Sequence, residues 1–135
     1  FPRRVGLMSY DMFEGCVNLT AVMLPENLSE IYSSMFSGCK NLKKVDIPAS
    51  VNKVGNSAFS DSGITSLDLS NVKEFEGFCF SGCKALKTVK LNSSLKENFL
   101  METYQEFTEC PLLEVKYINN EYVFPEGFIF VDGSR

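Results

Sequence analysis

A short segment of this chain is repeated, and the repetition restricts the fold more than any other feature. Residues 35–45 read MFSGCKNLKKV, and residues 79–89 read CFSGCKALKTV. Weaker copies begin at Phe13, Phe59 and Phe107. The phenylalanines of the five copies stand 23, 23, 21 and 27 residues apart. A period in this range predicts stacked coils, because one coil alone cannot bury its apolar face.

Each copy continues into a short segment with alternating apolar residues. These segments are Val22-x-Leu24, Val45-x-Ile47, Leu67-x-Leu69, Val89-x-Leu91 and Val115-x-Tyr117. Alternation with a period of two predicts a strand with one buried face. We therefore expect one parallel strand per ~23-residue coil, with short helical turns or loops on the convex side. Gly15, Gly38 and Gly82 follow a phenylalanine by two residues, where a left-handed residue would end such a turn.

The shared positions form one pattern, F-x-G-C-x-x-L-x-x-V-x-I-P. It resembles the leucine-rich repeat of the BspA-like surface proteins, also called the Treponema pallidum type. The resemblance covers residues 5–117, with Val5 and Met8 matching the end of a truncated coil. Ser62 in place of cysteine, and Ser70 and Asn92 in place of proline, depart from the pattern. The resemblance implies a right-handed leucine-rich-repeat solenoid.

The chain divides into a repeat region over residues 1–117 and an atypical end. We expect a partial coil over residues 1–12, repeats that start near residues 13, 36, 59, 80 and 107, and an atypical strand or cap over residues 118–135. Ser94 and Glu97 form a capping-box pattern, which predicts a helix of two to three turns before Phe107. Terminal repeats are atypical because they cover the end of the core. The sequence also has the character of a fragment of a longer protein.

The composition argues against several functions. The net charge of −4 gives no basic surface for a phosphate backbone, so we expect no nucleic-acid partner. No apolar run approaches the ~20 residues that cross a bilayer. The sequence has no histidine, which removes the commonest general base and every mixed Cys/His zinc site. We expect no enzymatic activity, no cofactor and no metal site.

The cysteines are the first candidates for chemistry. Four of the five share one repeat position, three residues after a phenylalanine: Cys16, Cys39, Cys83 and Cys110. Cysteines one coil apart are near enough in principle for a disulfide. A small apolar side chain also suits a tight stacking position, however, and cysteine is among the most buried residue types. We therefore favour buried free thiols.

The outward positions of the strands are the second candidates. The expected partner-binding residues on the concave sheet are Met23, Lys44, Asp46, Ser66, Asp68, Thr88, Lys90, Glu114 and Lys116. Like charges on adjacent strands, such as Asp46 beside Asp68, are mildly destabilising unless a ligand uses them. A solvated polar face without any partner accounts for the same residues. Repeat proteins, on the other hand, present extended sheets of this kind to other proteins.

The resemblance implies a non-catalytic protein–protein interaction module of a microbial cell-surface or secreted protein. The implied partners are other proteins, including host extracellular-matrix or cell-surface proteins, and the implied activity is adhesion. The alternative is a structural spacer or envelope-assembly solenoid without a specific ligand. The outward side chains of the sheet distinguish the two hypotheses, because function resides in the site and not in the fold.

Overall fold

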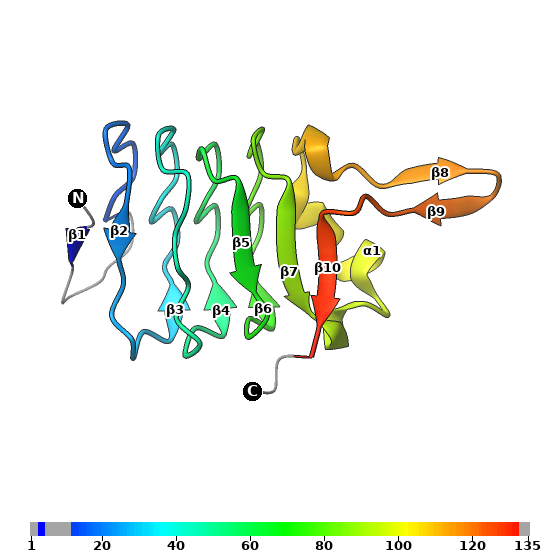
Figure 1. Cartoon of the computed structure of the whole chain (residues 1–135), viewed down its shortest axis with the longest axis horizontal. Coiled ribbons are helices and arrows are strands. Elements are labelled where there is room, and N and C mark those ends of the chain that lie inside the picture. Colours follow the sequence, from blue (N-terminus) through cyan, green and yellow to red (C-terminus); the bar gives the residue numbers. More distant parts are fainter. Residues whose placement is uncertain (1–2, 5–11, 133–135) are drawn as a thin grey trace.

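The chain winds into coils that stand side by side, as Figure 1 shows. The computed structural model describes residues 3–4 and 12–132, so the coil end expected at Val5 and Met8 lies outside the described residues. One phenylalanine from each coil stacks on the next, with ring centroids 4.8–5.8 Å apart, in the order Phe13, Phe36, Phe59, Phe80 and Phe107. We number the coils 1 to 5 by these residues. All five rings are buried, so the repeated phenylalanine forms a column through the stacked coils that the period predicts.

Parallel strands line the front of the stack in Figure 1. Their bounds are Arg3–Arg4 for β1, Val22–Met23 for β2, Ser66–Leu69 for β5, Thr88–Asn92 for β7 and Phe128–Val131 for β10. β1 pairs with β2, and β7 lies between β5 and β10. Residues 42–48 of coil 2 form no regular strand, contrary to expectation. Val45 is nevertheless buried in the common core, so side-chain packing continues where the backbone ladder stops.

The fifth strand of this front sheet is not the segment expected at 115–117. β8 (Lys116–Ile118) pairs antiparallel with β9 (Glu121–Val123), and the hairpin projects past the end of the stack in Figure 1. Its two-residue turn holds Asn119 and Asn120 at φ values of 53° and 67°, the conformation that closes tight hairpins. In coil 4 the strand residue Val89 follows Leu86 by three positions, whereas in coil 5 the equivalent Phe128 follows Leu113 by fifteen positions. The hairpin is therefore an insertion in coil 5, and β10 takes the strand position.

A second parallel sheet forms where the sequence predicts helical turns or loops. It consists of β3 (Glu30–Ile31), β4 (Lys53–Val54) and β6 (Glu74–Phe75). The turns that precede the front segments of coils 1, 2 and 4 contain Gly15, Gly38 and Gly82 at φ values of 70°, 76° and 77°. The predicted left-handed glycines are thus confirmed. The second sheet therefore joins coils 1, 2 and 3 along another side of the stack.

The helix predicted before Phe107 is broken into short pieces. These are η1 (Ser93–Leu95), α1 (Phe99–Glu102), η2 (Tyr104–Phe107) and, after a turn, η3 (Pro111–Leu113). The Asn92 side chain, not Ser94, caps the first piece, because its oxygen accepts the Ser94 N–H at 2.9 Å. Phe99 packs against Phe128 at 5.0 Å between ring centroids. Directing these aromatic residues into the core at β10 requires bends that a single straight helix lacks.

The cysteines are free thiols, as predicted. The thiols of three of them donate hydrogen bonds of 3.0 Å to phenylalanine carbonyls of the preceding coil: Cys39 to Phe13, Cys83 to Phe59 and Cys110 to Phe80. Burial raises the pKa of Cys39 to about 11, so this thiol stays protonated at neutral pH. The cysteine position therefore joins neighbouring coils through hydrogen bonds.

Candidate protein-binding face

The outward side chains of the front strands, together with those of the extended segment 42–48, line one side of the stack, which we call the strand face. It comprises Met23, Lys44, Asp46, Ser66, Asp68, Thr88, Lys90 and Ile129. In coils 2 to 4 these residues alternate with the buried Val45, Leu67 and Val89, so the predicted division into inward and outward positions is confirmed there. The inward positions build the core, and the outward positions are left to contact solvent or a partner.

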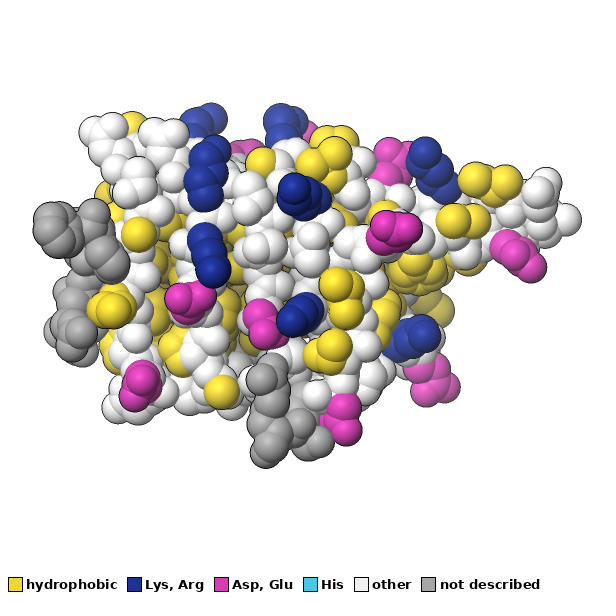
Figure 2. All heavy atoms as spheres, viewed as in Figure 1, with side chains coloured by type: hydrophobic (Ala, Val, Ile, Leu, Met, Phe, Trp, Pro, Cys, Tyr) yellow, Lys and Arg dark blue, Asp and Glu magenta, His cyan; other side chains and the backbone are white. Residues whose placement is uncertain are grey.

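The charges of the strand face are mixed. Figure 2 shows acidic and basic side chains interleaved over the middle of this face, with hydrophobic side chains to either side. Asp68 lies opposite Lys90 on the neighbouring strand. The Asp68 carboxylate accepts hydrogen bonds from the Ser70 backbone N–H at 3.1 Å and from the Ser70 hydroxyl at 2.7 Å. These bonds fix the orientation of the carboxylate at the end of β5.

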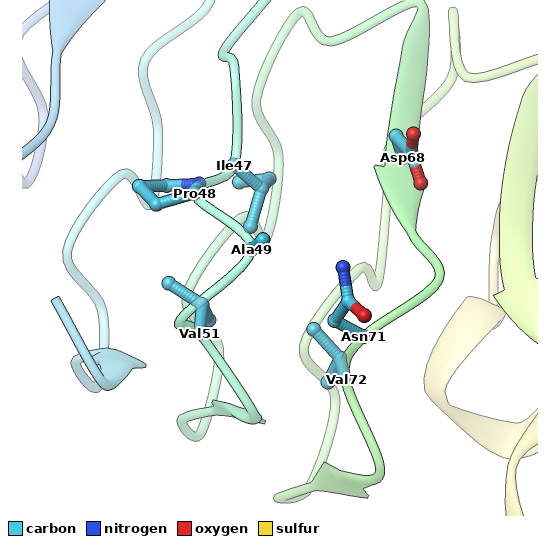
Figure 3. Close-up of a pocket in the computed structure, with 7 residues that line it drawn as sticks. All are labelled: Ile47, Pro48, Ala49, Val51, Asp68, Asn71 and Val72. Carbon is cyan, nitrogen blue, oxygen red and sulfur yellow. The ribbon is translucent and has the colours of Figure 1, made fainter. Parts of the chain in front are cut away.

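Three hollows on the strand face adjoin one another. One of about 350 Å³ lies among Lys44, Asp46, Asp68 and Lys90, and one of about 230 Å³ lies between Met23 and Asp46. The third, of about 180 Å³, opens between coils 2 and 3. Figure 3 shows its walls, with Ile47 from one coil and Asp68 from the next. Ile47 lines all three, so the hollows lie next to one another across the strands, and we call them together the groove.

Two of the expected site residues are not on this face. Lys116 lies in the projecting hairpin, paired with Val123, and Glu114 lies beside a different hollow. Ile129 is the register partner of Lys90 and occupies the place expected for Lys116. The expectation was wrong because the hairpin insertion imitates a repeat strand. The alternation in Phe128-Ile129-Phe130 was the sequence signal for the true strand.

Gly127 stands directly before β10, and its lack of a side chain allows the backbone to approach β7 closely. The Gly127 carbonyl accepts the Val89 N–H at 2.7 Å, which brings the two backbones together. A Cβ atom at this position would overlap the Lys87 carbonyl oxygen, so a side chain there would push β10 away from β7.

A wider hollow of about 650 Å³ lies on the flank of coil 5. Its apolar wall includes Leu100, Tyr104 and Phe107, and Lys84 and Glu114 lie at its margin. The Tyr104 hydroxyl accepts the Val115 N–H at 2.8 Å and so ties this flank to the base of the hairpin. This hollow is separate from the groove of the strand face, because the two have no lining residue in common.

Within residues 3–4 and 12–132, no three His, Cys, Asp or Glu side chains lie together in a way that could hold a metal ion. None of the helices in that same part of the chain combines the length and the apolar character needed to span a membrane. The candidate site is therefore an exposed surface with a shallow groove and fixed charges.

Stacked coils, parallel strands with a repeat near 23 residues and a buried phenylalanine column define a leucine-rich-repeat protein. The family model described as "BspA type Leucine rich repeat region (6 copies)" matches residues 7–128. The chain belongs to this family.

Two solved structures are similar to this chain. A leucine-rich repeat protein from Bacteroides ovatus is 26% identical with a TM-score of 0.58, over 64% of this chain and 22% of that one. A leucine-rich cell surface protein from Faecalibacterium prausnitzii is 21% identical with a TM-score of 0.52, over 89% of this chain and 32% of that one. The matched region thus spans a third or less of each of those proteins. A comparison with curated protein sequences found no significant match.

Proposed function

We propose that this chain is a non-catalytic protein-interaction module and that its strand face contacts the partner. One observation carries the proposal: coils that fill their inward positions with apolar residues leave mixed charges and adjoining hollows on one outward face. Stacked repeats offer extended surfaces of this kind to other proteins. We also propose that the coils form a right-handed solenoid whose concave side is the strand face.

The setting we propose is a microbial cell surface or the secreted fraction, where the module adheres to host extracellular-matrix or cell-surface proteins. Membership of the BspA-type repeat family supports this setting. The similar chain from Faecalibacterium prausnitzii is itself named a cell surface protein, although at 21% identity that likeness concerns the fold.

The test is binding of the purified chain to a panel of purified extracellular-matrix proteins, measured by biolayer interferometry. A variant with Asp46→Ala, Asp68→Ala and Lys90→Ala removes the central charges of the strand face. Because truncating charged contacts of an interface costs ~2 kcal/mol or more, we expect binding to weaken by at least roughly tenfold.

The control variant carries Lys53→Ala, Glu74→Ala and Glu76→Ala on the second sheet. It removes the same number of basic and acidic groups. It breaks the exposed Lys53–Glu76 ion pair of 3.4 Å and the exposed 3.3 Å hydrogen bond from the Asn56 N–H to the Glu76 carboxylate, and such exposed contacts contribute little to stability. We expect this variant to bind like the unmodified chain. Equal binding by all three proteins contradicts a role for the strand face. If no panel member binds the unmodified chain, the spacer hypothesis is favoured instead.

A further inference from the structure

The strand face presents different chemistry in a fixed order from coil to coil. Met23 is 46% exposed at one end and shares a hollow with Asp46. Asp46 shares the central hollow with Asp68 and Lys90. Ile129, 36% exposed, lies beside Lys90 at the other end. Along the strand face the order is therefore apolar, acidic, acidic, basic and apolar.

The spacing of these groups matches that of an extended polypeptide. Strands paired in a parallel sheet, such as β5 and β7, lie ~4.8 Å apart, and alternate residues of an extended chain point to the same side at intervals of ~6.7 Å. Over coils 1 to 3, where the front ladder is interrupted, the stacked phenylalanine rings lie 5.3–5.5 Å apart. An extended segment laid across the strands would therefore advance by roughly 1.2 to 1.4 coils for every second residue. With one side chain over Met23, the next inward side chain falls between Asp46 and Asp68, and the following one reaches Lys90.

We propose that this groove binds an extended segment of a partner protein in which an apolar, a basic and an acidic side chain occupy alternate positions. The inference rests on the proposed function and specifies the partner. The apolar side chain contacts Met23 and the wall formed by Leu24 and Pro48. The basic side chain pairs with the two carboxylates, and the acidic one pairs with Lys90.

The surrounding residues favour this order of charges over its reverse. The bonds from Ser70 hold the Asp68 carboxylate in place before any partner arrives, which lowers the entropic cost of pairing. Lys44 lines the same hollow and repels a second basic side chain, so it restricts the register of the segment. Ser66 and Thr88 are half-buried there and offer hydroxyl groups to the backbone of the segment.

The experiment uses fluorescein-labelled peptides and the whole chain, with affinity measured by fluorescence anisotropy. The test peptide has leucine, arginine and glutamate at alternate positions with serine between them, and it is made in both chain directions. The control peptides have the same composition with arginine and glutamate exchanged. We expect one direction of the test peptide to bind roughly tenfold more tightly than either control, which corresponds to one correctly placed charge pair.

A variant with Asp46→Lys and Lys90→Asp exchanges two charges of the face without changing the net charge. It leaves the Asp68–Ser70 hydrogen bonds intact, and circular dichroism checks that it folds. We expect this variant to prefer the peptides with exchanged charges. We also expect the preference of the unmodified chain to shrink as salt is raised, because exposed charges are screened.

Equal affinity for test and control peptides overturns the proposal, as does the absence of binding by every peptide up to about 1 mM. A preference that the charge-exchanged variant does not reverse also overturns it. A different result contradicts the proposed function: the variant with Asp46, Asp68 and Lys90 replaced by alanine then binds a matrix protein as tightly as the unmodified chain does. If a matrix protein does require these three charges, but the peptides show no preference, only the proposed peptide motif is contradicted.

Discussion

The Glu106 carboxylate accepts a hydrogen bond of 2.6 Å from the backbone N–H of Phe78, where earlier coils use a backbone carbonyl. Ser34 N–H donates to the Asn56 carbonyl, and Ser57 N–H donates to the Gly77 carbonyl, in each case across to the next coil. The interval from Phe80 to Phe107 exceeds the usual 23 residues by four. Glu106 thus replaces a backbone acceptor that the longer coil does not supply.

Glu106→Gln is expected to raise the stability of the chain at pH 7 by about 1 kcal/mol, because an amide oxygen still accepts the Phe78 N–H without burying a charge. Glu106 is only 4% exposed, and burial raises the pKa of its carboxyl group. When the pKa of a carboxyl group is higher in the folded than in the unfolded chain, the group contributes most to folding stability below its unfolded pKa of about 4.3. This contribution is lost as pH rises through the pKa of the folded state. The advantage of the variant should therefore shrink as pH falls from 7 towards 4.

Urea unfolding of both proteins at several pH values measures this difference. Glu106→Ala is the control: it leaves the Phe78 N–H without this acceptor and should cost about 1–3 kcal/mol. Should the glutamine variant be as unstable as the alanine variant at pH 7, the carboxylate would be needed for its charge.

Phe78→Gly is expected to stabilise the chain by about 1 kcal/mol, because left-handed backbone conformation costs residues with a Cβ roughly 1–2 kcal/mol. Phe78 has a φ of 60°, and its side chain is 59% exposed, so little packing is lost with the ring. Thermal unfolding measures the effect. Phe78→Ala keeps the strained backbone and should give no gain; a gain equal to that of glycine would assign the cost to the exposed ring instead.

Phe59→Ala is expected to cost about 3–5 kcal/mol, since it leaves a cavity in the middle of the phenylalanine column. The Phe59 ring stacks on Phe36 at 5.3 Å and on Phe80 at 5.8 Å. Phe78→Ala removes a ring of the same size that is 59% exposed and lies outside the column, and it should cost far less. Urea unfolding followed by circular dichroism compares the two variants. Equal losses would mean that the stacked column does not contribute more to stability than an exposed ring does.

Thiol labelling of the native chain with a chromogenic disulfide reagent should show one fast-reacting cysteine and four protected ones. Cys16 is half-buried, whereas the other four cysteines are buried. Burial also raises the pKa values of Cys39 and Cys79, which reduces their reactive thiolate fraction. Cys16→Ser should abolish the fast phase, and all five thiols should react after denaturation. Rapid native labelling of all five would contradict the buried cysteine position.

The sequence by itself determined the coil, the stacked rings and the inward and outward positions of coils 2 to 4. These features follow from a short pattern in which each residue meets its own equivalent in the next coil, so the period alone places Phe36 on Phe13 and exposes Asp46 and Asp68. The family resemblance follows from the same positions. Local patterns suffice wherever neighbouring coils have the same length.

Only the tertiary structure decided the last coil and the end of the strand face. The segment around Lys116 alternates like a repeat strand, yet β7 pairs with β10, which leaves Ile129 beside Lys90. Which of two strand-like segments joins a sheet depends on the backbone fit at Gly127 and on the packing of Phe99 against Phe128, contacts between residues distant in sequence. An insertion shifts the repeat register, so beyond it the packing of side chains determines which segment pairs with the neighbouring strand.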